Sequence, residues 1–105
     1  MSAALIPLFP LSIVLFPGQA VPLHIFEPRY RIMTRHCIET QSPFGIVLAH
    51  EEDIAQIGCS ALIVKTLKEY EDGRSDILTA GQSAFRLIRT HEEKIHMEAD
   101  VEYLE

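Results

Sequence analysis

Side chains that could carry out catalysis are few in this sequence, and they do not form a recognisable catalytic pattern. Lys65 and Thr66 match the end of a phosphate-binding loop, but the apolar run 62–64 precedes them where that loop needs glycines. The sequence also lacks the Gly-x-Ser-x-Gly turn that presents a nucleophilic serine in many hydrolases. We therefore expect no catalytic residues, and neither ATP hydrolysis nor peptide-bond cleavage by this chain.

The histidines and cysteines are spaced too widely to predict a metal site. Zinc sites use close ligand pairs such as Cys-x-x-Cys, and the sequence contains none. Cys37 and Cys59 are better explained as buried free thiols, since two cysteines alone make a poor disulfide framework. We expect no bound metal and no cofactor. The histidines are His24, His36, His50, His91 and His96.

A small basic cluster could contact phosphate groups. It consists of Arg29, Arg31 and Arg35. The alternative is that these arginines form ion pairs with Glu27 and Glu39 and are otherwise solvated. The chain has 9 Lys and Arg against 15 Asp and Glu, so its net charge is 9 − 15 = −6. Such an acidic domain is a poor candidate for nonspecific binding to nucleic acid.

An apolar surface is the second candidate site. The first 26 residues carry no charged side chain, and a small domain cannot bury all of their apolar area. We expect Phe16, Pro17, Pro22 and Phe26 to form an exposed patch beside strand edges, which could contact a protein or a second copy of the chain. The alternative is that these side chains complete the core.

The composition predicts one folded, soluble domain. A length of 105 residues fits a single domain, and 48% hydrophobic residues argue against disorder. The uncharged stretch 1–26 is long enough to span a membrane, but Pro7, Pro10, Pro17 and Pro22 would break a helix there. No positively charged segment precedes it, as a signal peptide requires. We expect no membrane association and a cytoplasmic location.

Apolar patterning predicts many short strands, which favours a β-barrel or folded sheet. Strands are expected at 5–9, 12–16, 20–26, 44–49, 58–70, 76–80, 84–89 and 95–103, and Pro7 indicates a sheet edge. Turns are expected at 71–74 and 81–83, and a loop or short helical turn at 50–56.

One helix is expected between the third and fourth of these strands. Pro28 suits a first helical position, and the helix should end near residues 40–43. Tyr30, Met33 and Cys37 would form a stripe that faces the core. The fold predicted from patterning is therefore mainly β with one α-helix.

Several blocks of sequence together resemble the LON domain, the amino-terminal domain of ATP-dependent Lon proteases, which also occurs as stand-alone bacterial proteins. The amino-terminal blocks are IPLFPL (6–11), LFPG (15–18) and VPLHIFEPRYR (21–31). The later ones are FGIVL (44–48), IGC (57–59), DGR (72–74), Gly81 with FRL (85–87), and ADVEYL (99–104). They follow the family's order and cover essentially the whole chain.

The resemblance implies a PUA-like pseudo-barrel of about six to seven short strands with one helix packed against it. Residues 1–105 would be the amino-terminal β-subdomain, without the helical subdomain that follows it in the family. The implied role is a noncatalytic protein-interaction module that recognises polypeptide substrates or partner proteins in Lon-type proteolysis or quality control. The alternative is a PUA-like RNA-binding module that uses Arg29, Arg31 and Arg35.

Overall fold

The computed structural model of this chain describes residues 2–51, 53–93 and 95–104. Strands dominate, and the described residues contain one helix, as the patterning predicts. In chain order the elements are β1 (Ser2–Leu11), β2 (Ala20–Ile25), α1 (Pro28–Thr40), β3 (Phe44–His50), β4 (Asp53–Glu69), β5 (Ser75–His91) and β6 (Glu98–Tyr103).

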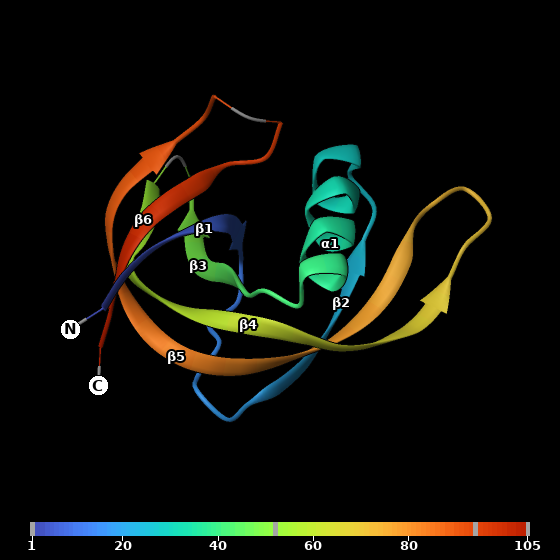
Figure 1. Cartoon of the computed structure of the whole chain (residues 1–105), viewed down its shortest axis with the longest axis horizontal. Coiled ribbons are helices and arrows are strands. Elements are labelled where there is room, and N and C mark those ends of the chain that lie inside the picture. The colour runs from blue at the N-terminus through green and yellow to red at the C-terminus, as the bar shows by residue number, and fades with distance from the viewer. Residues whose placement is uncertain (1, 52, 94, 105) are drawn as a thin grey trace.

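Five of the strands close into a ring (Figure 1). The sheet order is β2-β5-β4-β3-β1-β6, and a further pairing of β6 with β5 completes the barrel. β1 and β3 run parallel, whereas the other pairs are antiparallel. The predicted pseudo-barrel is confirmed, although β4 and β5 are not short, since each has 17 residues.

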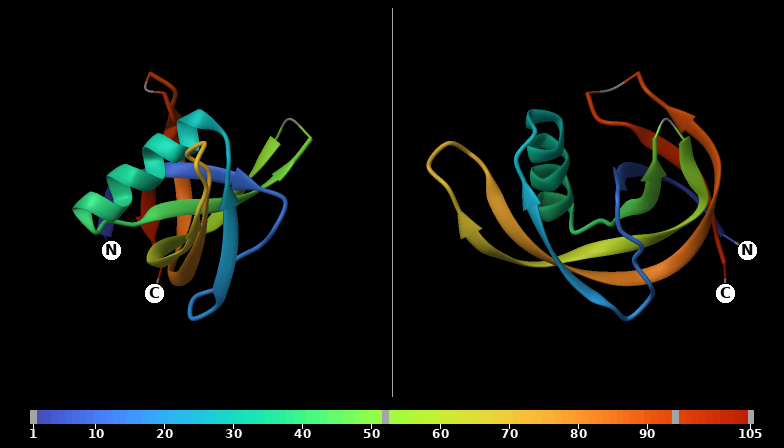
Figure 2. Two further views of the ribbon diagram at one scale, coloured as in Figure 1. Left: turned by 90° about the vertical axis from the view of Figure 1, so that its right-hand side faces the viewer. Right: turned by 180° about the vertical axis from the view of Figure 1, so that it is seen from behind.

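The length of β5 lets it belong to two parts of the sheet. Its first part, residues 75–80, pairs with β2, and its last part, residues 85–91, pairs with β6. β2 therefore lies outside the ring and extends the sheet together with the outer ends of β4 and β5. Helix α1 packs beside this extension rather than inside the barrel (Figure 2).

Phe85 fills the centre of the barrel and is fully buried. It lies directly opposite Gly58 in the register of β4 and β5. A Cβ atom at Gly58 would come within 2.6 Å of the Phe85 ring, and one at Gly45 within 2.9 Å. The two glycines therefore provide the space for the ring. The other buried members of this core are Ile6, Leu8, Val47, Leu87, Ala99 and Val101.

A second core lies between the sheet and α1. Tyr30, Met33 and Cys37 are buried there, so the predicted helical stripe is confirmed. The Tyr30 ring packs on Phe9 of β1 with 4.1 Å between ring centroids. The helix ends at Gln41, whose left-handed backbone (φ 54°) lets its N–H group reach the last carbonyl groups of the helix.

Two predictions about the chain between β1 and β2 and about Gly81 are wrong. Residues 12–16 are irregular and cross the outer face of β4 and β5 instead of forming a strand (Figure 2). Gly81 lies inside the continuous strand β5 and makes no turn. It is hydrogen-bonded to Gly18 and Gln19, and a Cβ atom there would collide with the carbonyl oxygen of Phe16. This glycine marks a close crossing of two segments.

Three other expectations need smaller corrections. The predicted loop at 50–56 is shorter, because β4 already begins at Asp53. Pro7 lies within β1, a strand with neighbours on both sides, but the register pairs β6 up to Pro7 and β3 only from Leu8. Pro7 thus lies where the strand partner of β1 changes from β6 to β3, and this place accommodates a residue without an N–H group. The last strand begins at Glu98, and Ile95 is exposed.

The space around Phe85 predicts how two glycine substitutions will behave. Gly45→Ala should lower the free energy of unfolding by about 1–3 kcal/mol, because the new methyl group meets the Phe85 ring. Phe85→Leu removes the far end of that ring. Gly45→Ala should therefore lower the free energy of unfolding by less when Phe85 is already replaced by leucine. Urea denaturation of the single and double variants measures both costs.

Gly58→Ala is the matched control. Its methyl group would also lie 2.6 Å from the carbonyl oxygen of Ile46, which belongs to the backbone and cannot move aside. Its cost should therefore persist in the Phe85→Leu background. An equal cost of Gly45→Ala in both backgrounds would show that the ring does not set the space at this position.

Candidate functional site

Phe16 and Pro17 border an apolar hollow on the outer face of the barrel. The hollow has a volume of about 170 Å³, and all of its lining residues are apolar or glycine. The chain crossing before β2 forms one wall, with Val14 50% and Phe16 63% exposed. β3 and β4 form the floor, where Ile57 is 51% exposed. Several large apolar side chains therefore meet water together at this place.

Phe26 and Pro22 do not belong to that hollow. The Phe16-Pro17 turn precedes β2 and Phe26 follows it, so the length of β2, roughly 17 Å, separates them. Phe26 is 54% exposed and stacks on His24 with 5.8 Å between ring centroids. It lines a separate hollow of about 250 Å³ beside the start of α1. Pro22 is exposed on β2 between these two places.

The three arginines of the basic cluster have different surroundings. Arg29 forms an ion pair with Glu27 at 3.5 Å and lies over the Tyr30 ring. Arg31 instead donates hydrogen bonds to two backbone carbonyl oxygens, those of Phe26 (2.9 Å) and Asp72 (2.8 Å). The side chain of Arg35 has neither a hydrogen bond nor an ion pair with the described residues. The expected pairing with carboxylates is therefore wrong for Arg31, which ties α1 to the β4–β5 hairpin.

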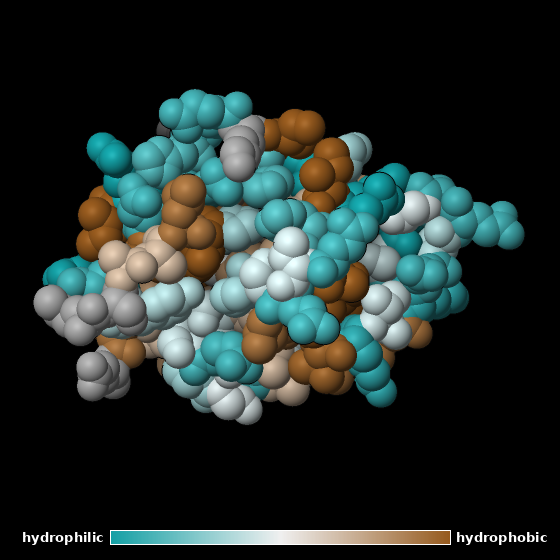
Figure 3. Space-filling model, in the orientation of Figure 1, coloured by the Kyte–Doolittle hydropathy of each residue, from teal (hydrophilic) through white to brown (hydrophobic). Residues whose placement is uncertain are grey.

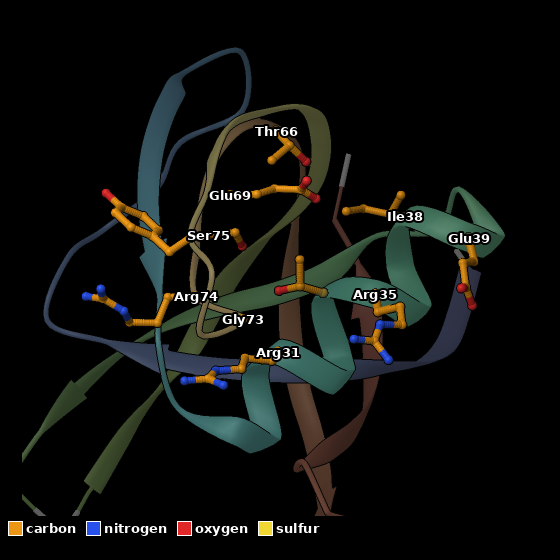
Figure 4. Close-up of a pocket in the computed structure, with 11 residues that line it drawn as sticks. Arg31, Arg35, Ile38, Glu39, Thr66, Glu69, Gly73, Arg74 and Ser75 are labelled. Atoms are coloured by element: carbon orange, nitrogen blue, oxygen red, sulfur yellow. The ribbon is translucent and has the colours of Figure 1, made fainter.

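A polar cleft lies between α1 and the β4–β5 hairpin (Figure 4). Its volume is about 400 Å³, and Arg31, Arg35 and Arg74 line it together with two glutamates. Thr34 also lines it, although its side chain is buried. Its hydroxyl oxygen finds no hydrogen-bond partner among the described residues.

One cluster of titratable side chains has no signal in the sequence. His24 Nδ1 lies 2.6 Å from one carboxylate oxygen of Asp76, and the Tyr70 hydroxyl donates to the other at 2.8 Å. The hydrogen bond from His24, followed by that from Tyr70, lowers the pKa of Asp76 below its ordinary value. These residues meet through the β2–β5 register and the hairpin, and they fasten β2 to the hairpin.

The described residues offer little for metal binding or nucleophilic catalysis. Within them, no three His, Cys, Asp or Glu side chains are grouped to hold a metal ion. Both cysteines are free and buried, and burial raises the pKa of the Cys37 thiol to about 11, so it stays protonated at neutral pH. In the same residues, no helix has the length and apolar character to cross a membrane.

Comparison with known proteins connects this geometry to one family. The model of the ATP-dependent protease La (LON) substrate-binding domain matches residues 5–105. The Lon protease of Parabacteroides distasonis is 30% identical over 109 residues, which cover 95% of this chain and 13% of that protein. The Lon protease of Paraburkholderia phytofirmans is 30% identical over 99 residues, covering 87% of this chain and 12% of that protein.

Solved structures agree with these sequence matches. A Lon N-terminal domain protein from Xanthomonas campestris superposes with a TM-score of 0.85 at 31% identity, over 97% of this chain and 60% of that chain. The N-terminal domain of Mycobacterium avium complex Lon protease superposes with a TM-score of 0.77 over 97% of this chain and 55% of that chain. Its identity is 13%, so this second match concerns the fold alone.

The packing of Tyr30 predicts that the start of α1 is primarily structural. Tyr30→Ala should lower the free energy of unfolding by about 2–4 kcal/mol, because it leaves a cavity beside Phe9. Ile32→Ala on the same helix is the control. Because Ile32 is 45% exposed, its truncation should lower the free energy of unfolding only slightly. Thermal and urea denaturation measure both. An unchanged stability of Tyr30→Ala would contradict the structural role.

The contacts of Asp76 predict a pH dependence of stability. Its pKa in the folded chain lies below the ordinary value of 3.8, so the carboxylate stabilises the fold above that pH and ceases to do so as the pH falls through the lowered pKa. The difference in melting temperature between the native chain and Asp76→Asn should therefore be largest near neutral pH and shrink in acid. Asp53→Asn, at an exposed carboxylate, serves as the control. A difference for Asp76→Asn that does not change with pH would contradict the assignment.

Proposed function

The chain belongs to the family of LON substrate-binding domains, and from this premise we propose that it is a noncatalytic module that recognises polypeptides. Its role would be to hold protein substrates or partner proteins in Lon-type proteolysis or quality control, in the cytoplasm. The name of the family model, which specifies substrate binding, supports the proposal. The arrangement of side chains described above also suits binding better than catalysis.

The apolar hollow beside Phe16 is the observation that carries this proposal. Unfolded or partly folded polypeptides differ from folded proteins by exposing large apolar side chains, so a receptor for them needs apolar contact area. The hollow offers such area around Phe16, Val14 and Ile57, with no charged side chain among its lining residues. The same surface could join two copies of the chain.

The arginines give less support to the RNA-binding alternative. Arg29 and Arg31 are occupied by contacts within the chain, and Arg29 lines a different hollow from Arg35. A net charge of −6 also opposes binding to a phosphate backbone. Polypeptide recognition therefore remains the function that the site supports best.

A charged substitution at Phe16 tests the proposal. Phe16→Asp should weaken binding of an unfolded model polypeptide, reduced and carboxymethylated α-lactalbumin, by about ten-fold or more, as expected for loss of a central aromatic contact. Isothermal titration calorimetry measures the affinity, and sedimentation velocity measures self-association in the same samples. Circular dichroism confirms that the variant is folded.

Leu5→Asp is the matched control, because Leu5 is 55% exposed but does not line the hollow. It should bind like the native chain. If Phe16→Asp folds and leaves both affinity and self-association unchanged, the hollow is not the interaction surface.

A further inference from the structure

A long groove separates α1 from the outer half of β4. The polar cleft of about 400 Å³ continues into a second hollow of about 470 Å³, since Ile38 and Thr66 line both. One wall of this α1–β4 groove is the helix, and the other is β4 beyond residue 61 with the hairpin that follows it. Figure 4 shows the hairpin end of the groove, with side chains from both walls.

The outer half of β4 has an open backbone edge along this groove. β4 pairs with β3 only as far as Ala61, whereas its pairing with β5 continues to Glu69. From residue 62 onward, the side of β4 that faces away from β5 therefore has no strand partner in the described sheet. Backbone N–H and C=O groups at such an edge can bind an extended polypeptide as an added strand.

Apolar side chains at this edge could contact such a strand. Val64 is 57% exposed, Leu67 49% and Ile38, on the facing helix, 44%. Figure 3 shows hydrophobic atoms over β4 below the helix, interspersed with hydrophilic ones. The edge therefore offers contacts for the alternating side chains of an extended segment as well as for its backbone.

The groove is positively charged in a chain that is acidic as a whole. Its lining includes Arg31, Arg35, Lys65 and Arg74, of which Arg74 is paired with Asp72 at 2.7 Å, but only two acidic side chains, those of Glu39 and Glu69. Arg35 lacks a partner within the described chain, so its guanidinium group is available to a ligand. A carboxylate is the group of a polypeptide that such a guanidinium binds best.

Thr34 provides an independent observation at the same place. Its side chain is 5% exposed and lines the groove, and its hydroxyl group has no hydrogen-bond partner among the described residues. An unpaired buried hydroxyl destabilises the folded chain, and a ligand atom that hydrogen-bonds to it would remove that penalty. Thr34 and Arg35 line the same polar cleft, so the neutral donor and the positive charge border one space.

We propose that an extended, acidic polypeptide segment binds in the α1–β4 groove by adding a strand to the open edge of β4. Its backbone pairs with residues 62–69, and a carboxylate at one end contacts Arg35 and the Thr34 hydroxyl. This inference rests on the proposed function and specifies the class of polypeptide recognised. It concerns a surface separate from the apolar hollow at Phe16, so the two can fail independently.

Three synthetic decapeptides test the proposal with the whole chain. The first alternates threonine and valine and ends in two aspartates, the second ends in two lysines, and the third is the acidic peptide with alternate backbone nitrogens methylated. The acidic peptide should bind at least about ten-fold more tightly than either of the others. The basic peptide lacks the carboxylates that contact Arg35, and the methylated peptide lacks the backbone N–H groups that pair with β4. It should also slow amide hydrogen exchange in residues 62–69.

Two substitutions in the groove separate binding from folding. Arg35→Glu should weaken binding of the acidic peptide by about ten-fold or more, through loss of a charge-assisted contact and added repulsion. Thr34→Val keeps the shape of the side chain and removes the unpaired hydroxyl, so the melting temperature should stay the same or rise while affinity falls about three- to ten-fold. Arg89→Glu, at an arginine whose side chain is 73% exposed and outside the groove, is the charge control.

The outcomes are distinct. Equal affinity for the acidic and methylated peptides would overturn strand addition, and equal affinity for the acidic and basic peptides would overturn carboxylate recognition. Exchange protection confined to the Phe16 hollow would overturn the groove as the site but leave polypeptide recognition intact. Tight, salt-sensitive binding of a poly-uridine RNA that Arg35→Glu abolishes would assign the groove to nucleic acid instead.

Discussion

The packing of Phe85 inside a narrow barrel is the constraint on which the rest of the structure depends. A ring of five strands has room for one aromatic side chain at its centre only if the residues that face it carry no side chain. Gly45 and Gly58 meet this condition on β3 and β4. Because the ring lies opposite Gly58, it also fixes the register of β4 against β5. A shift by one residue would turn Phe85 outward and leave the barrel empty.

The two long strands, β4 and β5, stay paired beyond the barrel. β4 and β5 run on together past the ring, and β2 pairs with β5 there. The extension gives α1 a surface to cover, which creates the second core around Tyr30 and Met33. The same extension leaves the outer half of β4 without a second neighbour. The closed barrel and the open groove are therefore two consequences of one pair of strands.

Polar and apolar surfaces are separated on this member of the LON family, as the proposed recognition of polypeptides requires. The apolar hollow lies on the outer face of the barrel, and the positively charged groove lies beside the helix. Burial raises the pKa of both cysteine thiols, and the His24–Asp76 pair fastens β2 to the hairpin. Contact, hydrogen bonding and charge are the interactions that these described surfaces offer.

The sequence by itself determined the elements whose signals are local. The stripe of Tyr30, Met33 and Cys37 located the helix, and Asp72-Gly73 located the hairpin, because each depends on neighbours a few residues apart. The exposure of Phe16 also followed from counting uncharged residues at the start of the chain. Patterning left a β-barrel and a folded sheet as alternatives, and the blocks that resemble LON domains specified the pseudo-barrel.

Only the tertiary structure decided which distant segments meet. Gly81 looked like a turn but accommodates the crossing chain at Phe16, and residues 12–16 looked like a strand but cross over the sheet without pairing with a strand. Phe16 and Phe26, expected in one patch, lie at opposite ends of β2. Thr34 and the open edge of β4 carried no signal in the sequence. The local sequence pattern indicates whether a side chain prefers to be buried. Strand register and barrel closure determine which residues it contacts, and both depend on residues far apart in the chain.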